Sequence, residues 1–132
     1  MCSERTTILL VEDDGDTSFA LSILLGVEGY KVVRASSVKE AYDDAVADHP
    51  DLVVTDIEMP LQSGLDLIKL FKQNSALARV PIIVVSAMEK ARLQIARALG
   101  AVAVYQKPLE YERLISAIRS LLPRTGVAIA GK

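Results

Sequence analysis

Five short runs of apolar residues, rich in β-branched side chains, recur along the chain. Continuous apolar runs of this length are typical of buried strands, since both faces of such a strand meet other side chains. The predicted strands are Thr7–Val11, Lys31–Ala35, Leu52–Thr55, Pro81–Val85 and Ala101–Tyr105.

Stretches with apolar residues at helical spacing separate and follow these runs. Each stretch predicts an amphipathic helix. The apolar positions are Phe19, Ile23 and Leu24; then Ala41, Ala45 and Val46; then Leu67, Ile68 and Phe71; then Leu93, Ala96 and Arg97–Leu99; and finally Leu114, Ile115, Ile118, Leu121 and Leu122.

Gly29, Pro50, Pro81 and Gly100 stand at the predicted strand boundaries. Strands that alternate with helices form right-handed βαβ units and a parallel sheet with helices on both faces. The pattern therefore predicts an α/β fold, a (βα)5 chain packed as a three-layer sandwich.

Composition narrows the class of protein. The 132 residues are 51% hydrophobic and 24% charged, which fits one domain with an aliphatic core, and the formal net charge of −2 does not favour direct nucleic acid binding. Cys2 is the only cysteine, so no intramolecular disulfide is expected. No apolar run approaches the roughly 20 residues that cross a bilayer, so we expect a cytoplasmic protein without membrane contact.

We place one domain at residues 1–123. The tail from 124 to 132 is rich in Gly and Ala, and we expect it to be flexible.

Polar residues follow four of the five predicted strands. They are Glu12, Asp13 and Asp14 after the first, Asp56 after the third, Ser86 after the fourth and Lys107 after the fifth. Because the carboxyl ends of parallel strands lie at one edge of a sheet, we expect these side chains to converge on one crevice.

Several carboxylates in one crevice repel each other unless a cation lies among them. Oxygen ligands suit Mg²⁺, which takes one or two carboxylates together with a phosphate oxygen and water. An aspartate carboxylate can attack phosphorus, while the metal, a lysine and a hydroxyl neutralise the transferring oxygens. Taken singly, Asp13, Asp14 and Ser86 could be helix caps and Lys107 an exposed loop cation, but their joint placement favours a phosphoryl site.

The motifs around these residues resemble the receiver domains of two-component response regulators. They are Ile8 to Asp14, Asp56-Ile57-Glu58-Met59-Pro60 with Gly64, Val85-Ser86-Ala87, and Lys107-Pro108, and the resemblance spans about Thr7 to Leu122. It implies a flavodoxin-like doubly wound fold with a five-stranded parallel sheet of order 2-1-3-4-5.

The resemblance also implies a role for each matched residue. Asp56 matches the phosphoacceptor and Lys107 the lysine that contacts the phosphoryl group. Ser86 matches the hydroxyl that bonds this group, and Ala87 its small neighbour. The metal ligands would be Glu12, Asp13, Asp56 and the backbone carbonyl of Glu58, whose side chain faces the entrance of the site; the ion would be Mg²⁺, with Mn²⁺ as an alternative.

Three further expectations come from the same resemblance. The Lys107-Pro108 peptide bond would be cis. Gly64 would lie in the loop after the third strand, where a positive φ would help the chain turn into the helix. Many receivers carry an aromatic switch residue three positions before the lysine, but here that position is Val104, and Tyr105 points to the opposite face.

The resulting prediction is a stand-alone receiver that accepts a phosphoryl group from a phosphohistidine on a sensor kinase or phosphotransfer protein. It would act on an unknown downstream protein target, with homodimer formation on phosphorylation as one form of output. It would not be an enzyme, beyond promoting its own phosphorylation and dephosphorylation. A phosphorelay intermediate, a phosphate sink, or a receiver cut from a larger regulator or hybrid kinase are alternatives.

Two functions of other classes are weaker alternatives. Small phosphohydrolases with an Asp nucleophile generally need a second Asp two residues later, where this chain has Glu58, and they carry a cap insertion that is missing here. A flavodoxin-like electron carrier would need hydroxyls and backbone donors in its first loop, which here is acidic.

Overall fold

The computed structural model describes residues 6–59 and 61–122. Cys2, Pro60, the predicted domain boundary at 123 and the predicted tail at 124–132 lie outside the described residues.

The five strands form one parallel sheet of order β2-β1-β3-β4-β5, which confirms the predicted topology. The strands are β1 (Thr7–Val11), β2 (Lys31–Ala35), β3 (Leu52–Thr55), β4 (Ile82–Ser86) and β5 (Ala103–Gln106). The bounds of β1, β2 and β3 are those predicted.

The last two strands begin later than the sequence pattern suggested. Pro81 has no N–H to donate and precedes β4, although its carbonyl accepts from Val53 N. The N–H of Ala101 donates to Ala96 O and thereby closes the preceding helix, so β5 begins only at Ala103.

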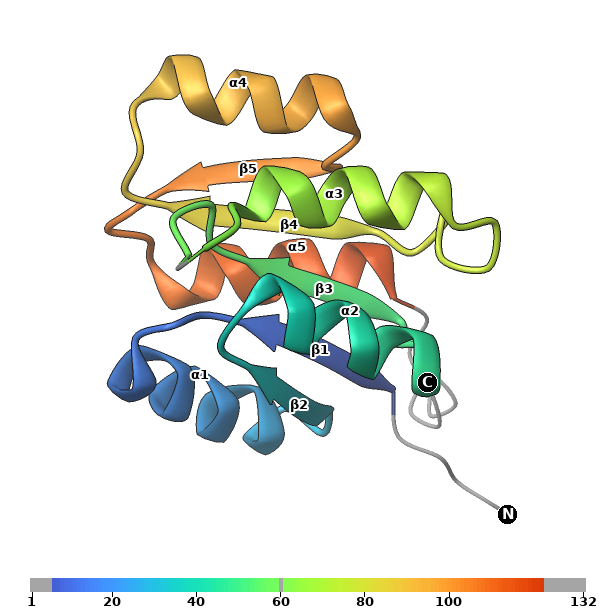
Figure 1. Cartoon of the computed structure of the whole chain (residues 1–132). Helices are drawn as coiled ribbons and strands as arrows, with labels where there is room; N and C mark the ends of the chain where they lie inside the picture. Colours follow the sequence, from blue (N-terminus) through green and yellow to red (C-terminus); the bar gives the residue numbers. More distant parts are fainter. Residues whose placement is uncertain (1–5, 60, 123–132) are drawn as a thin grey trace.

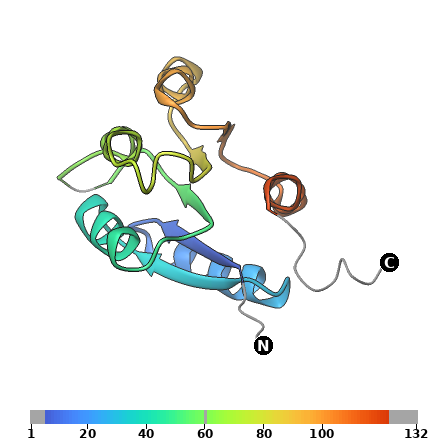
Figure 2. The same ribbon diagram turned by 90° about the vertical axis from the view of Figure 1, so that its right-hand side faces the viewer.

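Five helices cover the sheet in two layers (Figures 1 and 2). They are α1 (Gly15–Val27), α2 (Val38–Ala47), α3 (Gly64–Gln73), α4 (Lys90–Leu99) and α5 (Tyr111–Leu121). The core residues of α2, α3 and α4 cluster with one face of the sheet, and those of α1 and α5 cluster with the other.

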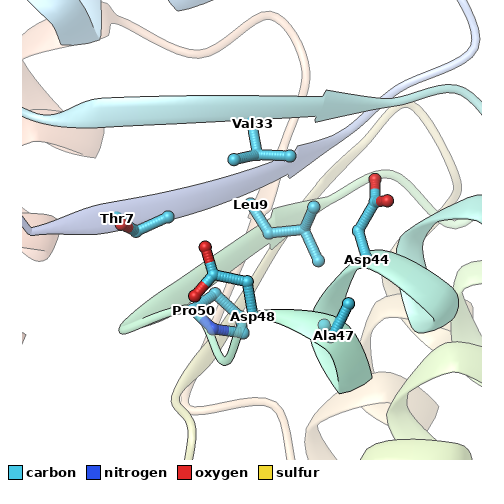
Figure 3. A pocket seen from close by; sticks show the side chains of 8 residues that line it. Thr7, Leu9, Val33, Asp44, Ala47, Asp48 and Pro50 are labelled. Carbon is cyan, nitrogen blue, oxygen red and sulfur yellow. The ribbon is translucent and has the colours of Figure 1, made fainter.

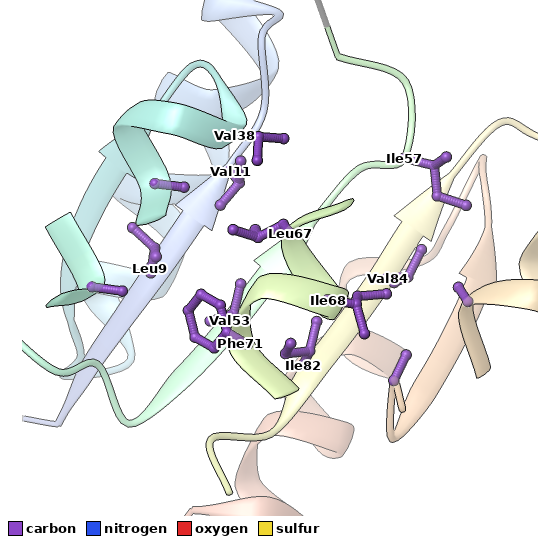
Figure 4. Packing of buried hydrophobic residues seen from close by; sticks show 14 of the residues in the cluster. Leu9, Val11, Val38, Val53, Ile57, Leu67, Ile68, Phe71, Ile82 and Val84 are labelled. Atoms are coloured by element: carbon purple, nitrogen blue, oxygen red, sulfur yellow. The ribbon is translucent and has the colours of Figure 1, made fainter. Parts of the chain in front are cut away.

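Alternation along β1 illustrates why two cores exist. Leu9 and Val11 face the core beneath α2, α3 and α4, which Figure 4 shows, whereas Ile8 and Leu10 face α1 and α5. Successive strand side chains point to opposite faces, so a strand that is apolar at every position holds both layers.

The predicted apolar face of α1 is wrong. Phe19, Ile23 and Leu24 are 56%, 50% and 42% exposed, while Ser18 and Leu25 are buried. Arg34 of β2 donates to Ser18 Oγ at 2.9 Å and to Gly15 O at 3.3 Å, which turns the Ser18 side of the helix towards the sheet.

The other helices follow the predicted faces more closely. Leu67, Ile68 and Phe71 of α3 are all fully buried, but Val46 of α2 and Leu121 of α5 are exposed. In the described part of the chain, no helix has the length and apolar character needed to cross a membrane.

Candidate functional site

The ends of three strands meet through one lysine side chain. Lys107, which follows β5, donates from Nζ to Glu12 Oε1 and to Asp56 Oδ2, each at 3.1 Å. Glu12 follows β1 and Asp56 follows β3, and both are buried, at 7% and 8% exposure. Buried carboxylates require pairing, and the Lys107 ammonium supplies it.

The Asp56 carboxylate is fixed by its own loop as well. Its Oδ1 accepts from the backbone N–H of Ile57 at 2.6 Å and of Glu58 at 3.3 Å. With Oδ2 bound to Lys107, both carboxylate oxygens have donors and a defined orientation. The Thr55 hydroxyl donates to the Asp56 carbonyl at 2.8 Å and holds the backbone beneath it.

The electrostatics of this group of charges follow from its burial. Burial raises the pKa of the Glu12 carboxyl, and the bonds from Asp14 N and Lys107 only partly oppose this. Burial alone would lower the pKa of the Lys107 ammonium, but hydrogen bonds and charges from Asp56 and Glu12 outweigh it and raise that pKa. A lysine with a raised pKa remains a cation at neutral pH.

Gly64 does not have the loop position and positive φ that the sequence analysis expected. It is the first residue of α3 and not a loop residue with positive φ, which occurs in this loop at Leu61 instead, with φ 71°. Its N–H donates to Ile57 O at 2.7 Å, and a Cβ at this position would lie 2.0 Å from the Asp56 carbonyl oxygen. Glycine is required here by close approach of two backbones.

Ser86 lies at the end of β4 and is fully buried. Its Oγ accepts from Met88 N at 3.2 Å, and in the described part of the chain no hydrogen bond joins Oγ to Asp56 or Lys107. The Ser86 carbonyl does accept from the backbone N–H of Lys107, at 2.9 Å. The N-cap of α4 is Glu89, so the alternative role of Ser86 as that cap is wrong. Ala87, the small residue expected beside the phosphoryl group, is exposed.

The other acidic candidates lie at the surface. Asp13, Asp14 and Glu58 are exposed. Asp14 is the N-cap of α1, and a hydrogen bond from Thr17 lowers the pKa of its carboxyl.

The carboxylate oxygens of the site are suitable ligands for a magnesium ion. Within residues 6–59 and 61–122, no three His, Cys, Asp or Glu side chains form a cluster that could hold a metal ion. Mg²⁺ does not need such a cluster, because it keeps several waters and binds one or two carboxylates. Glu12 and Asp56, which both bind Lys107, provide two such carboxylates.

Val104 and Tyr105 point to opposite faces of the sheet, as expected from the sequence. Val104 is half-buried and packs with the core beneath α2, α3 and α4, whereas Tyr105 packs on the α1 and α5 side, with Arg113 5.8 Å from its ring centroid. Tyr105 therefore does not replace an aromatic residue at position 104. The Lys107-Pro108 peptide bond is cis, as expected.

A separate cavity of about 160 Å³ lies at the opposite, amino-terminal edge of the sheet. It is lined by Thr7, Leu9, Val33, Asp44, Ala45, Ala47, Asp48 and Pro50, of which Figure 3 labels all but Ala45. None of the predicted site residues lines it, so the cavity and the strand-end site are distinct.

One polar contact at the site had no signal in the sequence. Gln106 Nε2 donates to Met88 O at 3.1 Å, joining the end of β5 to the loop after β4. A lone glutamine beside a lysine does not reveal which carbonyl it reaches, because this depends on the pairing of two strands.

Comparison with known proteins gives a consistent picture. Residues 8–119 match the model of the response regulator receiver domain. The polar-differentiation response regulator DivK of Brucella ovis is 34% identical over 117 residues, covering 88% of this chain and 95% of DivK.

Solved structures are similar over most of their length. Chemotaxis protein CheY4 of Vibrio cholerae superposes with a TM-score of 0.83 at 25% identity, over 90% of this chain and 100% of CheY4. Response regulator TrrA of Thermotoga maritima, in complex with Mg²⁺ and beryllofluoride, gives 0.80 at 27% identity, over 89% and 99%.

Proposed function

This chain belongs to the response regulator receiver domain family, a family of signalling domains and not of classical enzymes, and we propose that Asp56 is its phosphoacceptor. The donor is a phosphohistidine on a sensor kinase or phosphotransfer protein. The observation that carries the proposal is the Lys107 bridge between the buried carboxylates of Asp56 and Glu12, each at 3.1 Å.

Asp56 is better suited to nucleophilic attack than its acidic neighbours. Two backbone N–H groups and Lys107 hold its carboxylate in one orientation, which lowers the entropic cost of reaching the reactive geometry. In the described part of the chain the Glu12 carboxylate accepts from one backbone N–H, that of Asp14 at 3.2 Å, and Asp13 is exposed.

The transfer step exchanges one bond for another. The phosphorus–nitrogen bond of the phosphohistidine breaks as a phosphorus–oxygen bond to the Asp56 carboxylate forms. The imidazole nitrogen keeps the electron pair and takes up a proton. Lys107, already at the carboxylate, neutralises the transferring oxygens, Ser86 donates its hydroxyl proton to one of them, and the small Ala87 leaves room for them.

The ion proposed for this site is Mg²⁺, with Mn²⁺ as a substitute. Glu12, Asp13, Asp56 and the backbone carbonyl of Glu58 would hold it, and it would supply further positive charge to the phosphoryl oxygens. The exposed Glu58 side chain, two residues after Asp56, lies where it would influence hydrolysis of the phosphoaspartate.

The output of the domain is proposed to pass through protein contacts, including a homodimer formed on phosphorylation. A phosphoryl group adds a charge of about −1.5 to −2 to a buried site, which favours whichever packing of the surrounding loops pairs that charge better. The protein catalyses only its own phosphorylation and dephosphorylation.

Intact-mass measurement after incubation with Mg²⁺ and acetyl phosphate tests the proposal. We expect the unmodified chain to gain one phosphoryl group and Asp56→Asn to gain none, because the amide cannot form the acyl phosphate.

Asp48→Asn provides the matched control, since Asp48 is an exposed carboxylate at the opposite edge of the sheet. It should be labelled like the unmodified chain. Equal labelling of Asp56→Asn and Asp48→Asn would refute the assignment of Asp56.

A further inference from the structure

Gln106 occupies the position in β5 that is paired with Ser86. In the parallel pairing of β4 with β5, Val84 lies beside Val104 and Ser86 beside Gln106. Side chains two residues apart on a strand share a face, so Gln106 lies on the face of Val104, one step closer to the phosphoryl site.

The loop after β4 is held through both backbone groups of one residue. Met88 N donates to Ser86 Oγ at 3.2 Å, and Met88 O accepts from Gln106 Nε2 at 3.1 Å. Met88 thus links the hydroxyl of Ser86 to the side chain of Gln106. Its side chain packs against the same core as Val104.

We propose that Gln106 is a positioning residue that holds the β4–α4 loop in its resting arrangement and so controls when Ser86 is released to the phosphoryl group. The proposal rests on the proposed function of Asp56 and Ser86 and deepens it. It assigns to Gln106 the link between site and loop that the aliphatic Val104 does not provide.

The direction of the effect follows from the contacts. The Ser86 oxygen accepts from Met88 N in this structure, and a rotation of the Ser86 side chain towards a phosphoryl group on Asp56 would carry Oγ away from that N–H. The Gln106 bond keeps Met88 in place and therefore favours the resting loop. Removing it increases the population of the alternative loop, and a ligand that selects this population then binds more tightly.

The test uses Gln106→Met, which keeps the length of the side chain and removes its donor. The probe is beryllofluoride titrated in the presence of Mg²⁺, followed by nuclear magnetic resonance of the backbone amides. We expect the apparent affinity to rise about twofold to fivefold, the range that corresponds to one partly exposed hydrogen bond. The midpoint of urea unfolding without ligand should fall only slightly, because the lost bond stabilises the resting fold by no more than the change in affinity reports.

Gln73→Met is the control, since Gln73 is an exposed glutamine at the end of α3. Its affinity for beryllofluoride should equal that of the unmodified chain. An affinity of Gln106→Met that is unchanged or weaker overturns the proposal.

A second measurement needs no variant. Hydrogen exchange at the Met88 amide of the unmodified chain should become faster when beryllofluoride is added with Mg²⁺, because the amide loses its Ser86 acceptor. Exchange that stays equally slow overturns the role of the loop while leaving the assignment of Asp56 intact. Failure of the unmodified chain to bind beryllofluoride at all would instead overturn the proposed function, and this inference with it.

Discussion

Gly64 lies with its backbone directly against the carbonyl oxygen of Asp56. A Cβ added there would lie 2.0 Å from that oxygen and 3.0 Å from Ile57 Cα. Both neighbours are backbone atoms, which cannot rotate away as a flexible side chain can. The residue that carries the proposed phosphoryl group is therefore positioned partly by the lack of a side chain eight residues later.

We predict that Gly64→Ala destabilises the protein by about 2–3 kcal/mol, the cost of overpacking against a rigid neighbour. It should also reduce phosphorylation from acetyl phosphate, since the clash displaces the Asp56 loop. Urea unfolding and intact-mass labelling measure the two effects. Gly26→Ala is the control: Gly26 lies within α1 with no atom within 4 Å of its added Cβ, and alanine should stabilise the helix by about 0.5–1 kcal/mol.

Among the helices, α1 is apolar around most of its surface, and the face that it buries is not its most apolar one. Phe19, Ile23 and Val27 recur every four residues and are 56%, 50% and 78% exposed. Leu25 is completely buried among residues of the sheet and α5. Apolar residues nearly surround this helix, so their spacing alone does not define the face that meets the sheet.

Two substitutions in α1 should therefore differ sharply. Ile23→Gln should change the free energy of unfolding by less than about 0.5 kcal/mol, because the side chain is already in water. Leu25→Ala should cost about 2–5 kcal/mol, because it leaves a cavity in the core. Denaturant unfolding of both variants is the measurement, and a larger loss for Ile23→Gln would show that the helix is rotated relative to this structure.

For the molecule as a whole, Lys107 joins parts of the chain that are distant in sequence. Its ammonium links the end of β5 to the ends of β1 and β3 across separations of 95 and 51 residues. The carboxylates of Glu12 and Asp56 are only 7% and 8% exposed, and they depend on the Lys107 ammonium to balance their negative charge. The proposed site thus contributes to the stability of the sheet as well as to chemistry.

We predict that Lys107→Met lowers the free energy of unfolding by about 1–3 kcal/mol, below the usual cost of breaking a buried pair because Lys107 is partly exposed. The loss arises because Glu12 and Asp56 are left as unpaired buried charges. Added Mg²⁺ should restore more stability to this variant than to the unmodified chain, since the ion replaces the missing positive charge.

Urea unfolding with and without MgCl₂ measures both effects. Lys39→Met removes the lysine of an exposed pair with Asp43 and should produce no measurable change in either condition. A Lys107→Met protein as stable as Lys39→Met would contradict the structural role of the lysine.

The sequence by itself determined the fold class, the first three strands, the buried face of α3 and the identity of the residues at the strand ends. These features depend on local patterns: continuous apolar runs, helical spacing in an unambiguous amphipathic helix, and the rule that parallel strands end at one edge. The family resemblance added the order of the sheet and the cis Lys107-Pro108 bond, both present in the structure.

Only the tertiary structure decided which face of α1 is buried, why residue 64 must be glycine, and what Gln106 contacts. Each depends on distances between segments that are far apart in sequence: Arg34 with Ser18, Gly64 with the Asp56 carbonyl, and Gln106 with Met88. Local patterns state which residues can be buried or can donate hydrogen bonds. The pairing of strands and the packing of helices against them select which of those contacts form.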